Sequence, residues 1–251
     1  MKVYLDQQIW ALLENGSFDV EIINRAARLG DCKYYLSVAH LEELHNAEIK
    51  ESEDKQGITK RLELFMKKYC IPGIIKETLK GVKFHEGEKE YQIARKSVWG
   101  DNTAHTVQVM SDMGLYAQKN NLIDPKNLFT GRRHEQDTEY KDIWKIPKII
   151  NILNVYGIEN AKYQDMKDYL ELLSTMTLAF TALTAAGYKR DKNRRLHNSG
   201  AYDIQHAIRA TYCDVFVTQD ENFRKKYKAV AYYLQIPIEI LSFKEFEEKY
   251  S

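Results

Sequence analysis

The chain has few of the features that mark secreted or membrane-spanning proteins. None of its apolar runs approaches the roughly 18 residues that a bilayer span needs. The three cysteines, Cys32, Cys70 and Cys213, have neither an even count nor paired spacing, so they predict neither disulfides nor a zinc knuckle. The apolar run at the N-terminus is too short for a secretory signal. We therefore expect a cytoplasmic protein that does not enter a membrane.

The chain also has almost no net charge and few prolines. The net charge is +1 at pH 7, so any binding of nucleic acid must depend on local clusters of lysine and arginine. With only four prolines, long linkers are not expected. Apolar residues make up 44% and charged residues 29%, which is an ordinary globular composition. The 251 residues suffice for one large domain or two small ones.

Short strands alternate with helices in the first part of the chain. The strand-like runs are rich in β-branched, aromatic and apolar residues, as in strands that are covered on both faces. The expected elements are a strand at 2–5, helices at 7–14 and 19–29, a strand at 34–38, helices at 39–51 and 58–69, and a strand at 70–75. This order predicts a three-layer α/β/α domain with a central, mostly parallel sheet.

The middle of the chain, residues 76–160, looks different because its patterns predict only helices. We interpret it as an all-helical insertion between two parts of the α/β core, residues 1–75 and 161–251. Its expected helices lie at 86–99, 104–120 and 140–155. The second part of the core should contain a long apolar helix at 166–186, a strand at 215–217, a helix after Asp220 followed by the segment 230–234, a strand at 237–241 and a helix at 243–250.

Two aspartates stand directly after expected strands. Asp6 follows the first strand, and Asp220 comes just after the strand at 215–217. If the two strands are parallel neighbours, both side chains reach the same crevice, because ligands in open α/β folds bind at the carboxyl ends of the strands. Asp31 and Asp214 precede strands, at the opposite edge of the sheet, so we leave them out of the candidate site.

Two further acids complete the set of candidates, and each of the four also has a structural explanation. Asp203 is expected in the first turn of its helix, where an acid interacts favourably with the helix dipole. Glu43 lies away from the leucine stripe of its helix, as a solvated surface glutamate would. Asp6 and Asp220 could serve as helix N-caps.

Several stretches of this chain together resemble the PIN domain, the nuclease fold of toxin ribonucleases and of several RNA-processing enzymes. Residues 2–6, KVYLD, are similar to the first strand and first acid of that family. Residues 37–44, SVAHLEEL, resemble its strand-to-helix segment, in which the glutamate precedes a leucine, and this register selects Glu43 over its neighbour. Residues 203–207, DIQHA, and 217–223, VTQDENF, resemble the segments that carry its third and fourth acids.

The resemblance covers about the first seventy and the last eighty-five residues. The C-terminal motif is fairly specific, and the other motifs are individually weak. The chain differs from small members of the family in its length, because Glu43 and Asp203 lie 160 positions apart (203 − 43). An insertion must account for this difference.

The resemblance implies an endoribonuclease that hydrolyses RNA phosphodiester bonds with Mg²⁺ or Mn²⁺. In such a site Asp6, Glu43, Asp203 and Asp220 would hold the metal, because clustered carboxylates repel one another unless a cation lies between them. These hard cations prefer oxygen ligands, and a water that the metal activates would attack phosphorus. Thr218 and Asn222 are expected to support the acids by hydrogen bonding.

A basic run before Asp203 provides the candidate contacts to RNA. It consists of Lys189, Arg190, Lys192, Arg194 and Arg195. Such a run grips phosphates in some proteins and is a solvated loop in others. The seventeen tyrosines include candidates for stacking on unpaired bases. His40, His45 and His206 are interpreted as structural, because a water activated by metal needs no histidine base.

Alternative functions remain open at this point. One is a non-catalytic PIN-like module that binds nucleic acid or another protein, although the presence of all four acids argues against it. Another is a structure-specific DNA nuclease, since related folds cut DNA by the same chemistry. A toxin role with an inhibitory partner protein and assembly into a homodimer are compatible with the resemblance as well.

Overall fold

The computed structural model forms two compact units, and each is described by itself. The described residues are 1–49, 57–70, 73–78, 80–99, 138–189 and 197–250. The first unit comprises residues 1–103, 209–220 and 238–251, and the second comprises 104–208 and 221–237. The helix expected at 104–120 lies outside the described residues.

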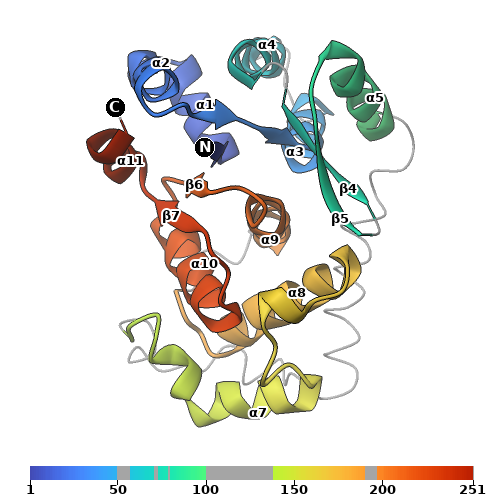
Figure 1. Ribbon diagram of the computed structural model, residues 1–251, viewed down its shortest axis with the longest axis vertical. Coiled ribbons are helices and arrows are strands. Elements are labelled where there is room, and N and C mark those ends of the chain that lie inside the picture. Colours follow the sequence, from blue (N-terminus) through green and yellow to red (C-terminus); the bar gives the residue numbers. More distant parts are fainter. Residues whose placement is uncertain (50–56, 71–72, 79, 100–137, 190–196, 251) are drawn as a thin grey trace. The chain divides into compact units, whose positions relative to one another are not determined.

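The first unit is built on a four-stranded parallel sheet (Figure 1). Its strands, in spatial order, are β2 (Lys33–Tyr34), β1 (Lys2–Leu5), β6 (Val215–Val217) and β7 (Glu239–Leu241). In the central pair Tyr4 lies opposite Phe216. All three pairings are parallel, so the carboxyl ends of the strands lie at one edge. This confirms the expected α/β class and the parallel sheet.

A second, mixed sheet continues from the same stretch of chain. It consists of β3 (Leu36–Ser37), β4 (Ile74–Thr78) and β5 (Gly81–His85), with β4 parallel to β3 and antiparallel to β5. Tyr35 donates its N–H to the carbonyl of Val3 in β1, at 3.1 Å, whereas Leu36 donates to Gly73 beside β4, at 2.9 Å. The single strand expected at 34–38 is therefore divided between two sheets.

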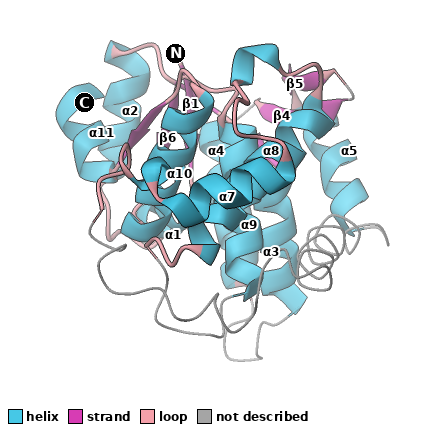
Figure 2. Ribbon diagram, turned by 90° about the horizontal axis from the view of Figure 1, so that it is seen from below, coloured by secondary structure: helices cyan, strands magenta, loops and turns pink. Residues whose placement is uncertain are grey.

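Apolar side chains from the helices of the first unit cover one face of the parallel sheet. These helices are α1 (Gln7–Glu14), α2 (Val20–Leu29), α3 (Val38–Ile49), α4 (Ile58–Cys70), α5 (Glu88–Trp99) and α11 (Phe243–Tyr250). Val3, Leu5 and Val217 face a core that contains the fully buried Trp10 and Phe246. Helices α2 and α11 lie side by side in both ribbon views (Figures 1 and 2).

The second unit is helical among its described residues. It contains α7 (Pro147–Tyr156), α8 (Tyr169–Ala185), α10 (Glu221–Leu234) and most of α9 (His197–Ala210), with short 3₁₀ helices at Ile143–Lys145 and Tyr163–Asp165. Helix α8 packs against α7 and α10. Its Phe180 contacts Phe223 and Tyr227 of α10, at ring-centroid distances of 6.4 and 6.2 Å. No helix in the described ranges is both long and apolar enough to cross a bilayer.

Three expectations about secondary structure were wrong. Strand β5 and the end of β4 lie within the stretch predicted to be all-helical, so helices there begin only at Glu88. Strand β5 begins at Gly81, whose φ of +131° suits glycine, and the charged residues of the hairpin hid its alternation. The segment 230–234 continues α10 instead of following it. Helix α7 begins at Pro147, and a 3₁₀ turn precedes it. The division at 76 and 160 remains a prediction.

Candidate functional site

The candidate site begins where β1 and β6 end side by side. Asp6 follows β1 and donates its backbone N–H to the carbonyl of Val217, the last residue of β6, at 2.9 Å. From β1 the chain proceeds to β2 on one side, and β6 lies on the other. The strand order therefore reverses between β1 and β6, and ligands of open α/β sheets bind at such a point. The adjacency on which the interpretation of Asp6 and Asp220 depended is confirmed.

The carboxylate of Asp6 is buried and does not cap the helix that it precedes. Asp6 occupies the N-cap position of α1, yet its side chain makes no capping hydrogen bond and is only 9% exposed. It accepts a hydrogen bond from the hydroxyl of Thr218 instead, at 2.7 Å. By contrast, Asp19 and Asp168 cap their helices, each accepting a backbone N–H at 2.9 Å. The capping explanation therefore fails for Asp6.

Thr218 joins the two aspartates that follow the strands. Its backbone N–H donates to Leu241 of β7, at 3.1 Å, and its side chain is fully buried. Its hydroxyl donates to Asp6 and accepts the backbone N–H of Asp220, at 3.2 Å. Asp220 is half-buried and directly precedes α10, so the capping explanation stays open for Asp220.

His40 fixes α3 against the end of β1. The backbone N–H of Ser37 donates to Nδ1 of His40, at 3.1 Å, so Nε2 carries the proton that is donated to the carbonyl of Leu5, at 2.9 Å. The imidazole is completely buried and packs on Tyr4, with ring centroids 4.8 Å apart. The structural interpretation of this histidine agrees with these contacts.

Glu43 lies three residues after His40 and therefore on the same face of α3. Its side chain is half-buried, whereas Glu42, two residues after His40, is 5% exposed and lies on a different face. Because His40 touches the carbonyl that precedes Asp6, the helix face of Glu43 is the one turned toward the end of β1. The choice of Glu43 over its neighbour stays a prediction.

The polar network behind the site is deeply buried. The hydroxyl of Tyr4 and that of Ser37 lie 2.6 Å apart, and burial raises the pKa of Tyr4 well above its usual value. The positive charge of Arg209 lowers this pKa, so the guanidinium of Arg209 lies within electrostatic reach of Tyr4. Arg209 is 3% exposed and forms an ion pair with Glu77 of β4. The sequence patterns did not single out this network.

Asp203 lies deeper in its helix than expected. Helix α9 begins at His197, so Asp203 is its seventh residue, and its first turn contains no acid. The expectation of a first-turn acid was wrong, because the helix runs through Gly200 despite the low helix propensity of glycine. The dipole explanation for Asp203 fails with it, since that effect is confined to the first turn. Asp203 belongs to the second unit, whereas the other three acids belong to the first.

The acids do not form a preassembled metal cluster among the described residues. No group of three or more histidine, cysteine, aspartate or glutamate side chains in that part of the chain is arranged to hold a metal ion. The convergence of Asp6, Glu43, Asp203 and Asp220 therefore stays a prediction. In its chemistry the set still suits Mg²⁺ or Mn²⁺, because it offers only oxygen donors, one of them the buried carboxylate of Asp6.

Asn222 and Lys189 are among the described residues, whereas the rest of the basic run is not. Asn222 is the second residue of α10 and is half-buried. Lys189 is described, with a φ of +46°. The remaining residues of the basic run, namely Arg190, Lys192, Arg194 and Arg195, lie outside the described residues.

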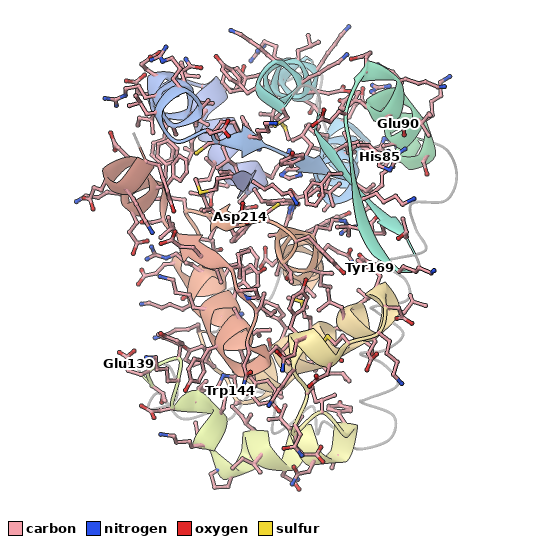
Figure 3. All side chains as sticks on the ribbon, viewed as in Figure 1. His85, Glu90, Glu139, Trp144, Tyr169 and Asp214 are labelled. Carbon is pink, nitrogen blue, oxygen red and sulfur yellow. The ribbon has the colours of Figure 1, made fainter. Side chains whose placement is uncertain are left out.

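Asp214 lies at the opposite edge of the sheet, as expected, and has a structural role. Its carboxylate accepts the backbone N–H of Lys2, at 2.7 Å, at the start of β1 (Figure 3). Its own backbone N–H donates to the carbonyl of Lys2, at 3.0 Å. Asp214 therefore helps to set the register of β1 and β6 and provides a control for substitutions at the other edge.

If the candidate site holds Mn²⁺, Thr218→Val should weaken that binding by about 10- to 100-fold, the usual cost of losing a group that orients a metal ligand. Valine keeps the shape of threonine but removes the hydroxyl that joins Asp6 to Asp220. Isothermal titration with Mn²⁺ measures the change, and circular dichroism checks the fold. Thr218→Ser keeps the hydroxyl and should retain the affinity. Unchanged Mn²⁺ binding by the valine variant would show that Thr218 has no part in the site.

Comparisons with known proteins provide no family assignment. No family model, curated protein or solved structure matches the chain.

Proposed function

We propose that this protein is a metal-dependent endoribonuclease with a PIN-like three-layer fold. The observation that supports it most is the buried carboxylate of Asp6, which Thr218 holds where β1 and β6 end together. This is the carboxyl edge of a parallel sheet, where ligands of open α/β folds bind.

In this proposal Asp6, Glu43, Asp203 and Asp220 hold Mg²⁺ or Mn²⁺. When bound, the ion would supply an acidic water for attack on phosphorus and would stabilise charge on the departing oxygen. Thr218 keeps the carboxylate of Asp6 in one orientation through its hydroxyl, while its backbone is held in the sheet. His40 holds the start of α3 against β1 and so limits where Glu43 can reach. Asn222 would support the acids from α10.

A second candidate function follows from the acids themselves. A non-catalytic nucleic-acid-binding module would need no group of acids that holds a metal, and the described residues contain no such group of three. The buried carboxylate of Asp6 favours the nuclease, since a binding module has no need of it.

A cleavage assay decides between these functions. We expect the purified protein to cut single-stranded RNA with Mn²⁺ or Mg²⁺ and to leave it intact with EDTA, because the ion supplies the attacking water. Gel electrophoresis of labelled RNA, single-stranded DNA and flapped DNA duplex measures the products. Cutting of DNA alone would favour the structure-specific DNA nuclease. Binding without cutting of any substrate would favour the non-catalytic module.

A further inference from the structure

Helix α10 presents a stripe of positive charge along one side. Arg224 and Lys225 stand four and three residues before Lys228, so all three lie on the same side of the helix, and Tyr232 continues that side by one turn. The opposite face is buried and includes Phe223 and Tyr227. From Arg224 to Tyr232 the stripe is about 12 Å long, at the usual rise per residue.

The charges of this stripe extend to the segment that precedes α9. Lys225 pairs with Glu221 one turn earlier in the helix. The pKa of Glu221 is lowered, chiefly by the hydrogen bond from Lys225 and further by the charges of Arg224 and Lys189. Lys189, the described member of the basic run, therefore lies within electrostatic reach of the start of α10. No ion pair with Lys228 occurs among the described residues.

Aromatic rings stand at the other end of the stripe. Tyr232 is 51% exposed and meets the ring of Tyr140 edge-on, with centroids 5.7 Å apart. The amino group of Lys141 lies 5.6 Å from the ring of Tyr140 and 5.9 Å from that of Tyr232. The exposed ring therefore offers a face beside a cation.

The aromatic end is held firmly to α10. The indole N–H of Trp144 donates to the carbonyl of Ala229, at 3.0 Å (Figure 3). The indole also stacks on Tyr233, with centroids 4.3 Å apart. These contacts fix the chain that carries Tyr140 and Lys141 against the helix, so the rings form part of a rigid surface.

Among Lys189, the charged residues of 139–145 and those on the stripe side of α10, cations outnumber acids six to three. The cations are Lys141, Lys145, Lys189, Arg224, Lys225 and Lys228, and the acids are Glu139, Asp142 and Glu221. Two of the acids are paired, Asp142 with Lys145 at 2.7 Å and Glu221 with Lys225. The surface therefore complements a polyanion.

We propose that this surface, the α10 strip, binds single-stranded nucleic acid. The α10 strip consists of Lys189, Arg224, Lys225, Lys228, Tyr232, Tyr140 and Lys141. Its cations would contact successive phosphates, and the exposed ring of Tyr232 would stack on an unpaired base. A basic helix face alone is often only solvated, but a duplex does not offer free base faces, so the rings favour a single strand. The inference that the bound nucleic acid is also the substrate rests on the proposed function. The inference that the α10 strip binds it does not.

Fluorescence anisotropy tests the α10 strip, with fluorescein-labelled oligouridylate and oligothymidylate of equal length in EDTA, where cutting cannot occur. The variant Lys225→Ala/Lys228→Ala should lower the slope of log affinity against log salt by about 1.4, since each phosphate contact on a single strand contributes about 0.7. The control Lys68→Ala/Lys244→Ala removes the same charge from α4 and α11 and should keep the slope. Tyr232→Ala should weaken binding about 5- to 150-fold, and Tyr232→Phe should not.

These measurements can also overturn the α10 strip. Failure of the wild type to bind either oligonucleotide would do so, as would an equal loss in the control pair or unchanged binding by Tyr232→Ala. Circular dichroism melting of each variant verifies that it is folded. Binding of either strand supports the inference, and the stronger one shows which of the two nucleic acids is preferred. Because EDTA removes cutting, a failed cleavage assay would leave this result intact.

Discussion

Asp6→Asn is expected to lower metal-dependent cutting of RNA by at least about 100-fold, while the protein stays folded. Removing a group that only orients a metal ligand costs 10- to 100-fold, and Asp6 is proposed as a ligand itself. Asparagine has nearly the same shape and can still accept the hydroxyl of Thr218, so the hydrogen bond survives and only the charge is lost. Initial rates of RNA cleavage and titration with Mn²⁺ measure the effect.

The matched control for this variant is Asp214→Asn. Asp214 stands at the opposite edge of the same sheet and accepts a backbone N–H that asparagine can also accept. The Asp214→Asn variant should therefore have the same activity and Mn²⁺ affinity as the wild type. Equal losses in both variants would indicate general damage to the sheet, and full activity of Asp6→Asn would exclude this carboxylate from catalysis. Asp203→Asn, compared in the same way, tests whether α9 contributes to the site.

Trp10→Ala should lower the free energy of unfolding of the first unit by about 4 kcal/mol, because replacing a buried tryptophan leaves a large cavity. The indole is fully buried in the core and meets the ring of Tyr34 edge-on, with centroids 6.1 Å apart. Such a loss is a large part of the stability of a typical domain. Urea unfolding followed by circular dichroism measures it.

Two further variants separate the cavity from other causes. The indole N–H of Trp10 has no hydrogen-bond partner among the described residues, so Trp10→Phe removes a buried unsatisfied donor as well as volume. It should cost less than half as much as the alanine variant. Leu64→Ala, at a leucine that is 58% exposed, should change stability by only about 0.5 kcal/mol. A loss at Trp10→Ala no larger than that of the leucine variant would contradict the assignment of Trp10 to the core.

Local patterns predicted best those elements whose ends carry their own signals. Helix α2 starts at the capping residue Asp19, and α11 starts at Ser242, whose backbone N–H and side chain exchange hydrogen bonds with Glu245. Strand β6 is a short apolar run between polar residues. In contrast, the β4–β5 hairpin gains its stability from pairing with β3, which its charged sequence does not reveal.

In the candidate site, too, some features could be predicted from the sequence and others could not. That Asp6 and the residues after β6 would meet could be inferred, because parallel neighbours share an edge. The role of His40 depends on a contact with Leu5, 35 positions away, and the sequence holds no local trace of it. The α10 strip did leave a signal, since Arg224, Lys225 and Lys228 recur at helical spacing. The run of charge before α9 is denser and gives the stronger sequence signal.

The way the chain is shared between the two units bears on how the protein folds. The chain passes from one unit to the other after Thr103, Ile208, Asp220 and Pro237. Val3 of β1 pairs with Val215 of β6, so the central pair of the sheet closes a loop of more than two hundred residues. Such non-local pairing makes folding slow. During synthesis β1 can pair with β6 only after more than two hundred further residues have been made, so the sheet of the first unit is completed late.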